Sequence, residues 1–179
     1  APPTFEPARS TMPIHVAIVD DHPLVRFGLK ALLNREDIVV VLEAENGLEL
    51  LTGLERASTL PDICLMDVHM PGMNGYEATL ELKRCWQQIK VLAISSFAHE
   101  YSIMEMTRNG AVGYLVKNSA PAIIIEAVRS VYEYGYYYSE VFNEGKANHL
   151  YDIPKNITKN ELRFLGVSCT DMTYAQIAK

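Results

Sequence analysis

The chain of 179 residues is long enough for one ordinary domain with a smaller unit beside it. With 49% hydrophobic and 21% charged residues it can bury a normal core, which excludes an intrinsically disordered chain. The net charge of −6 argues against a chain built wholly for nucleic acid, and no apolar run reaches the roughly 20 residues that a membrane span needs.

The beginning of the chain and its cysteines bear on location. Residues 1–13 lack the apolar segment of a secretion signal, and we expect them to form a disordered extension. Cys64, Cys85 and Cys169 do not have the spacing of a metal site. Free thiols are typical of a reducing compartment, so we expect a cytoplasmic protein that does not bind membranes.

Short apolar runs alternate with amphipathic segments between residues 14 and 135. The runs are rich in β-branched residues, and their continuous apolarity is typical of strands covered on both faces. In chain order we expect strand 14–19, helix 23–35, strand 38–44, helix 47–57, strand 62–66, helix 75–86, strand 90–94, helix 100–110, strand 111–116 and helix 120–135. This alternation predicts an α/β fold with a five-stranded, parallel, doubly wound sheet.

Two details of the helices carry further expectations. The first helix places Leu24, Phe27, Leu29, Leu32 and Leu33 roughly along one stripe, which we expect to face the core. We expect the tyrosines within 132–138 to cover the end of the last helix; a recognition surface is the alternative.

The regular alternation ends near residue 138, which predicts one domain over residues 14–138. Residues 139–157 have no clear periodicity and are interpreted as a linker. Two capping-box patterns follow, at residues 158–161 and 173–176, and predict two short helices in an all-α segment over residues 158–179.

Polar side chains follow four of the predicted strands at their carboxyl ends. Asp20 and Asp21 follow the first strand, Asp67 the third, Ser95 the fourth and Lys117 the fifth. In an open parallel sheet these ends meet at one edge, where ligands bind. Asp20 and Asp21 could instead simply cap the first helix, but the joint placement favours a site.

Three carboxylates in one place repel one another unless a cation lies between them. A hard ion such as Mg²⁺ prefers oxygen ligands and needs only one or two carboxylates. Carboxylates also serve as covalent phosphoryl acceptors. A phosphoryl group on Asp67 would fit beside Mg²⁺, with Lys117 neutralising its oxygens and Ser95 donating a hydrogen bond.

These residues carry a resemblance to a known family. The segments "VAIVDDHPLVRFGLKALL", "DICLMDVHMPGMNGYE", "VLAISS" and "GAVGYLVK" resemble the receiver domain of bacterial two-component response regulators, a flavodoxin-like fold. The first segment most resembles the NarL/FixJ type. The tail "ITKNELRFLGVSCTDMTYAQIAK" resembles the beginning of the LuxR-type helix-turn-helix domain, without its recognition helix.

The resemblance implies a role for each residue of the metal site. Asp67 would be both the phosphoacceptor and a Mg²⁺ ligand. Asp21 would bind Mg²⁺ directly and Asp20 would assist, while the backbone carbonyl of His69 would supply another ligand. The ring of His69, like those of His22 and His99, is interpreted as a loop side chain.

The resemblance also implies how the phosphoryl group is sensed. Lys117 would contact the phosphoryl group, Ser95 would be the switch hydroxyl and Tyr114 the switch aromatic, turning inward after phosphorylation. Asn74 stands where the family often has aspartate, and Asn118 stands where many receivers have proline.

The implied function is that of a response regulator rather than an enzyme, apart from slow self-dephosphorylation. A sensor histidine kinase would be the phosphoryl donor, and phosphorylation would favour a homodimer. We expect DNA binding only from a longer natural chain. Two alternatives remain: a receiver that acts as a phosphorelay shuttle or protein-interaction switch, and an aspartate-nucleophile phosphatase, which would favour aspartate where His69 stands.

Overall fold

The computed structural model describes residues 12–35 and 37–137. Its strands are β1 (Ile14–Val19), β2 (Ile38–Ala44), β3 (Ile63–Asp67), β4 (Lys90–Ser95) and β5 (Ala111–Val116). Its helices are α1 (Pro23–Leu33), α2 (Gly47–Arg56), α3 (Gly75–Cys85), α4 (Glu100–Asn109) and α5 (Pro121–Tyr134). All ten elements predicted between residues 14 and 135 are present, with bounds that differ by at most two residues.

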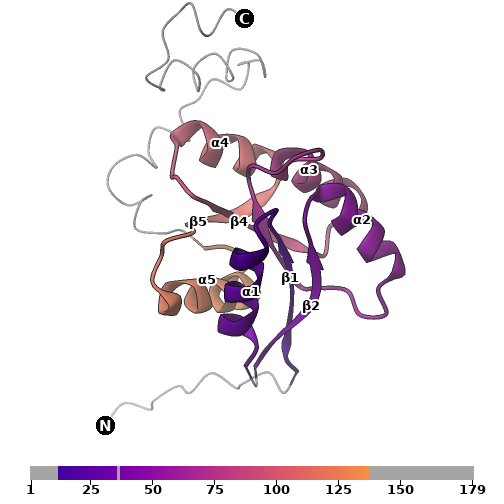
Figure 1. Cartoon of the computed structure of the whole chain (residues 1–179), viewed down its shortest axis with the longest axis vertical. Coiled ribbons are helices and arrows are strands. Elements are labelled where there is room, and N and C mark those ends of the chain that lie inside the picture. Colours follow the sequence, from indigo (N-terminus) through magenta and orange to yellow (C-terminus); the bar gives the residue numbers. More distant parts are fainter. Residues whose placement is uncertain (1–11, 36, 138–179) are drawn as a thin grey trace, which may run out of the picture.

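The sheet is parallel throughout and has the strand order β2-β1-β3-β4-β5. This is the flavodoxin-like order, in which the chain changes direction across the sheet between β1 and β3. Figure 1 shows α1 and α5 on one side of the sheet and α2, α3 and α4 on the other. The predicted fold class is therefore confirmed for this part of the chain.

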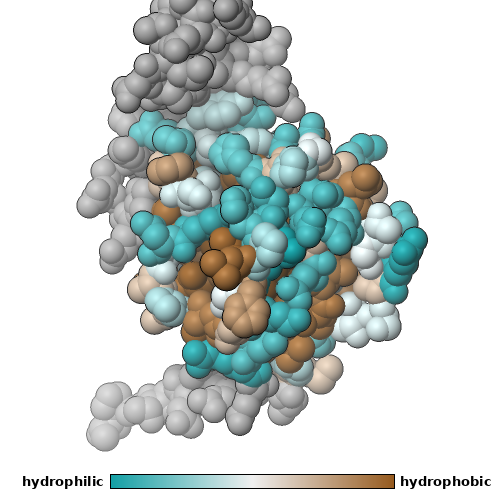
Figure 2. All heavy atoms as spheres, viewed as in Figure 1, coloured by the Kyte–Doolittle hydropathy of each residue, from teal (hydrophilic) through white to brown (hydrophobic). Residues whose placement is uncertain are grey.

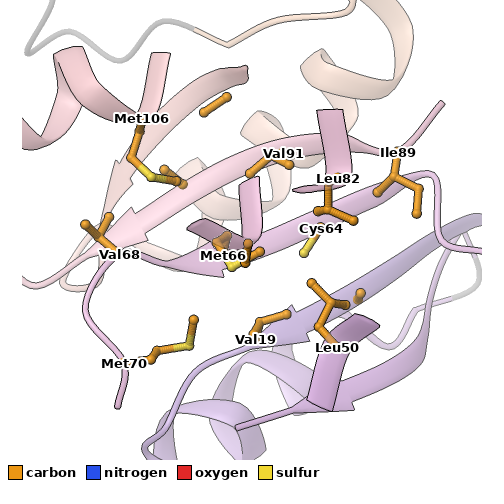
Figure 3. Close-up of a cluster of buried hydrophobic side chains, with 14 of the residues drawn as sticks. Val19, Leu50, Cys64, Met66, Val68, Met70, Leu82, Ile89, Val91 and Met106 are labelled. Atoms are coloured by element: carbon orange, nitrogen blue, oxygen red, sulfur yellow. The ribbon is translucent and has the colours of Figure 1, made fainter. Parts of the chain in front are cut away.

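Each face of the sheet has its own core. The aliphatic core, under α1 and α5, consists of Ile14, Val16, Ile18, Leu29, Leu33, Ile38, Ile63, Leu65, Leu92, Ile94, Leu115, Ile124, Ala127, Val128 and Val131. The mixed core, under α2, α3 and α4, consists of Ala17, Val19, Ala44, Leu50, Leu54, Cys64, Met66, Val68, Met70, Ala78, Leu82, Ile89, Val91, Ala93, Ile103, Met106, Ala111 and Tyr114. Figure 3 shows Met66, Met70, Met106 and Cys64 distributed through the mixed core.

The helix ends follow the signals in the sequence. Asn46 and Asn74 cap α2 and α3 through their side chains, and Asn74 forms a capping box with Glu77. Gly110 and Gly135 end α4 and α5 in the left-handed conformation, at φ of 115° and 90°. Asparagine at position 74 is thus suited to its place in the turn.

The expected stripe on α1 is wrong in part. Leu29 and Leu33 are buried, but Leu24 is 83% exposed and Phe27 is 70% exposed. The helix carries two sets of residues at helical spacing, and the set that faces the sheet contains the buried Leu29 and Leu33 and the partly buried Leu32. Figure 2 shows an apolar patch over α1 on the outer surface.

The tyrosines near the end of α5 were expected either to cover the end of the helix or to form a recognition surface, and they divide into a packed pair and an exposed pair. Tyr132 and Tyr137 pack against the aliphatic core, whereas the rings of Tyr134 and Tyr136 are exposed. The predicted linker and helix-turn-helix segment, residues 139–179, lie outside the described residues, as do residues 1–11 of the predicted extension. None of the described helices has the length and apolarity needed to cross a bilayer.

Candidate functional site

Three strand ends bring two carboxylates and one ammonium group together. Asp20 follows β1 and is fully buried, and Asp67 ends β3 and is 3% exposed. Lys117 follows β5, and its Nζ lies 2.6 Å from Asp20 Oδ2 and 2.8 Å from Asp67 Oδ2. The convergence predicted for the strand tips is present, and the lysine bridges the two acids.

The environment shifts the proton affinities of Asp67 and Lys117. Burial raises the pKa of Asp67, the negative charge of Asp20 adds to this, and the hydrogen bonds from Lys117 and the His69 amide oppose it. Burial lowers the pKa of Lys117, but the carboxylates of Asp20 and Asp67 more than offset this and hold it above the ordinary value. Lys117 is therefore fully protonated at neutral pH and available to neutralise an anion.

A group of four side chains at the same edge has the composition of a cation site. One oxygen or nitrogen atom from each of Asp20, Asp21, His22 and Asp67 lies within 4.8 Å of the others. Asp20 Oδ2 lies 2.6 Å from Lys117 Nζ and Asp21 Oδ1 lies 2.8 Å from His22 Nδ1. Carboxylate oxygens gathered in this way are the ligands that a hard divalent ion prefers, so the group suits Mg²⁺.

The ring of His22 belongs to this group, which the sequence analysis did not predict. His22 Nδ1 lies 2.8 Å from Asp21 Oδ1 and 3.3 Å from Asp20 Oδ1. His22 precedes the first residue of α1, and its backbone N–H donates to Asp20 Oδ1 over 2.9 Å. The signal for its position was its place directly after the two aspartates, where the turn into α1 brings the ring back over them.

The start of α1 also fixes the backbone of Asp20. Arg26 donates from one guanidinium nitrogen to the Asp20 carbonyl oxygen over 2.6 Å. Its other nitrogen lies 3.1 Å from Glu45 Oε1. Arg26 therefore ties the backbone at the end of β1 to Glu45, the residue that follows β2.

The loop after Asp67 returns close to the strand that it leaves. Gly75 N donates to Val68 O over 3.1 Å, and a Cβ atom at Gly75 would lie 2.1 Å from Asp67 O. Only glycine permits this approach. The His69 N–H donates weakly to Asp67 Oδ1 over 3.4 Å, while the role of the His69 carbonyl as a metal ligand stays a prediction.

Ser95 and Tyr114 lie next to each other beside the acid cluster. Ser95 is buried at the end of β4, and its carbonyl accepts from Lys117 N over 2.7 Å. Tyr114 is 3% exposed and donates from its hydroxyl to Phe97 O over 2.9 Å. This is the inward position that the sequence analysis expected only after phosphorylation.

The fold and the strand-tip cluster define a receiver-type signalling domain. The chain matches the response regulator receiver domain family over residues 16–129, more than half of its length, and it belongs to that family. The resemblance found in the sequence is confirmed.

Relatives and solved structures agree with this assignment. The chain is 33% identical over 162 residues to the uncharacterized transcriptional regulatory protein YxjL of Bacillus subtilis, covering 85% of this chain and 73% of that one. It is 37% identical over 118 residues to the nitrate/nitrite response regulator NarL of Escherichia coli K12, covering 65% and 53%. The chain thus spans between about half and three quarters of these relatives.

A solved receiver domain has the same fold. It is the signal receiver domain of the putative response regulator NarL from Mycobacterium tuberculosis, with a TM-score of 0.64 and 31% identity over 68% of this chain and 98% of that one. A LuxR-family two-component response regulator from Aurantimonas gives a TM-score of 0.69 at 28% identity, over 77% and 99%. These matches support a receiver of the NarL/LuxR type.

Proposed function

We propose that Asp67 accepts a phosphoryl group from a sensor histidine kinase in a Mg²⁺-dependent reaction. The observation that carries this proposal is the position of Asp67: a buried carboxylate at a strand tip, held between the Lys117 ammonium group and the acid pair Asp20 and Asp21. Burial leaves the Asp67 carboxylate poorly solvated, which favours its attack as a nucleophile.

Each residue then has a defined part in the transfer. An oxygen of Asp67 forms a bond to phosphorus while the bond from phosphorus to the donor's histidine nitrogen breaks, and the freed imidazole takes a proton from solvent. Lys117 stabilises the phosphoryl oxygens through its positive charge. Asp20, Asp21, Asp67 and the His69 carbonyl would hold Mg²⁺, which supplies the remaining neutralisation of the transferring group.

The phosphoryl group also provides a signal to the neighbouring surface. It adds negative charge and strong acceptor oxygens next to Ser95, whose hydroxyl would donate to one of them. Ser95 and Tyr114 lie on the neighbouring strands β4 and β5, so a movement of Ser95 would change the surroundings of the Tyr114 ring. The surface of α4, β5 and α5 would therefore differ between the two states.

The output is best explained by control of transcription. The relative YxjL is named as a transcriptional regulatory protein, and this chain covers 73% of its length. We propose that a longer form dimerises after phosphorylation and binds DNA through a C-terminal domain, in the cytoplasm. Residues 1–179 alone should bind no specific DNA, because they do not include a predicted recognition helix. A shuttle without DNA binding remains the second candidate. A phosphatase is less well supported, because His69 stands in place of the second aspartate.

The test is intact-mass spectrometry after treatment with acetyl phosphate and Mg²⁺. The wild-type chain should gain the mass of one phosphoryl group, and Asp67→Asn should gain none. Asp62→Asn is the matched control, because Asp62 lies just before β3, at the end of the strand away from Asp67. An undiminished mass gain in Asp67→Asn would exclude Asp67 as the acceptor.

A further inference from the structure

After α5 the chain turns back to the edge of the sheet. Gly135 ends α5 in the left-handed conformation, which changes the direction of the backbone. The next two residues, Tyr136 and Tyr137, reach β5, which is an edge strand of the sheet. We call residues 135–137 the exit segment, because they lead from α5 to the rest of the chain.

Two hydrogen bonds hold the exit segment in place. Tyr137 N donates to Val112 O in β5 over 3.0 Å, and Tyr137 forms a parallel bridge with Gly113. Ser130 Oγ in α5 donates to Tyr136 O over 2.9 Å. The exit segment is therefore fastened to β5 and to α5 at the same time.

Close packing adds to these hydrogen bonds. The ring of Tyr137 is partly buried and packs against the aliphatic core. A Cβ atom at Gly113 would lie 2.7 Å from Tyr137 O and 2.8 Å from Leu92 Cδ1, so only glycine permits this approach. Glycine inside a strand is typical of a site where another backbone comes close. Gly113 is therefore the residue against which the exit segment docks.

The strand β5 connects this contact to the acceptor site. Lys117 directly follows Val116, the last residue of β5. Its Nζ bridges Asp20 and Asp67, and its backbone N–H donates to Ser95 O over 2.7 Å. A group that draws Lys117 away from the two carboxylates therefore acts on the end of the strand that holds the exit segment.

A contact fitted to one arrangement of β5 favours that arrangement. The exit segment is docked while Lys117 bridges Asp20 and Asp67. A phosphoryl group on Asp67 places its oxygens beyond the carboxylate, so Lys117 can follow them only by leaving Asp20. Two contacts that depend on the same strand are coupled, and the coupling is reciprocal, so release of one favours release of the other.

We propose that Gly113 and Ser130 form a docking site for the exit segment, and that release of Lys117 from the two carboxylates weakens this docking. Phosphorylation then reaches the chain beyond residue 137 along β5. The inference rests on the proposed function, because the phosphoryl group on Asp67 is what releases Lys117. A substitution of Lys117 also breaks the bridge, so the coupling can be tested without phosphorylation.

The test measures hydrogen exchange of the Tyr137 amide by NMR in the chain of residues 1–179. This amide exchanges when the exit segment opens, because its hydrogen is bonded to Val112 O. In Ser130→Ala its exchange should become about fivefold faster, the effect of losing one ordinary hydrogen bond. Ser58→Ala is the matched control, because Ser58 is an exposed serine after α2, and it should leave the rate unchanged.

Gly113→Ala tests the close approach. The added methyl group meets the carbonyl of Tyr137, so exchange of the Tyr137 amide should become about tenfold faster or more. The rate is measured relative to that of the Asn34 amide, which donates to Lys30 O at the end of α1 and reports any general loss of stability. Unchanged relative rates in Ser130→Ala and Gly113→Ala would overturn the docking site.

Lys117→Gln tests the coupling. It removes the charge that binds the two carboxylates, and the Tyr137 amide should exchange about fivefold faster or more, a common size for coupling between two sites. Lys30→Gln is the matched control, because it removes a lysine that pairs with Glu43 between α1 and β2, and it should leave the rate unchanged. In the wild type, acetyl phosphate and Mg²⁺ should also accelerate the exchange.

The results separate this inference from the proposed function. An unchanged rate at Tyr137 in Lys117→Gln overturns the inference even if the wild-type chain is phosphorylated at Asp67. Conversely, a wild-type chain that gains no phosphoryl mass contradicts the proposed function, while the Lys117 variant still decides whether β5 couples the acid cluster to the exit segment.

Discussion

The two faces of the sheet differ in what they bury. The aliphatic core under α1 and α5 consists of aliphatic side chains alone. On the opposite face, Thr79, Ser102 and Glu105 are buried among methionines and Tyr114. The first face buries apolar side chains alone, whereas the second also buries polar groups, and this points to a division between a face built for stability and a face that can rearrange.

The largest stability effect should come from the aliphatic core. Leu33 is fully buried, and Leu33→Ala should lower the free energy of unfolding by about 2–5 kcal/mol, because it removes apolar contacts and leaves a cavity. Chemical denaturation measures the change. Leu24→Ala, on the exposed side of the same helix, should have almost no effect; a comparable loss there would mean that α1 is oriented differently.

The next effect concerns the loop at the site. Gly75→Ala should destabilise the protein by about 1–3 kcal/mol, because the new methyl group would meet the Asp67 carbonyl. It should also slow phosphorylation. Gly28 in α1 is the control, because a Cβ there meets nothing within 4 Å. Gly28→Ala should stabilise the protein by about 0.5–1 kcal/mol, so opposite signs are expected for the same substitution.

The Asp67 carboxylate in the acid cluster should make the stability of the protein depend on pH, and the direction of that dependence follows from its pKa. The pKa of Asp67 is raised in the folded protein, so its stabilising contribution is present below the ordinary value of 3.8 and is lost as the pH rises through the folded-state value. At neutral pH the ionised Asp67 therefore costs stability, and Asp67→Asn should have the higher midpoint temperature. Thermal unfolding measured at several pH values should show the difference in midpoint temperature between Asp67→Asn and the wild type vanish in acid. A variant that is less stable than the wild type at neutral pH would contradict a raised pKa of Asp67.

The smallest effect should come from a polar group in the mixed core. Thr79 Oγ1 is buried and has no hydrogen-bond partner among the described residues. Thr79→Val should therefore raise the free energy of unfolding by about 1 kcal/mol, because a hydroxyl is costly to bury unpaired. Thr107→Val is the control, since the exposed Thr107 hydroxyl donates to Ile103 O, and it should change stability little. Equal changes in the free energy of unfolding for Thr79→Val and Thr107→Val would show that the buried Thr79 hydroxyl carries no extra cost.

The fold and the main residues of the site could be predicted because their signals are local. Apolar runs and helix caps define the elements, and parallel strands bring their carboxyl ends to one edge. Asp20, Asp67 and Lys117 meet there for that reason alone. The roles of these residues in phosphoryl transfer remain predictions.

The parts that could not be predicted depend on contacts between elements. The orientation of α1 was misjudged because Leu24 and Phe27 have the same helical spacing as the buried set, and periodicity alone does not say which side meets the sheet. Tyr76 and Ser102 lie on different helices, 26 residues apart, so nothing in the local pattern pairs them. The ring of His22 was missed because its place depends on the turn into α1.

The central claim, that Asp67 is the phosphoryl acceptor, is tested most directly by locating the modified residue. Borohydride reduces an aspartyl phosphate to homoserine, which peptide mass spectrometry can assign to one position. After treatment with acetyl phosphate and Mg²⁺, we expect homoserine at position 67 and unchanged aspartate at positions 20, 21 and 62. Homoserine at position 20 or 21, or unmodified Asp67 in a chain that has gained the phosphoryl mass, would contradict the account.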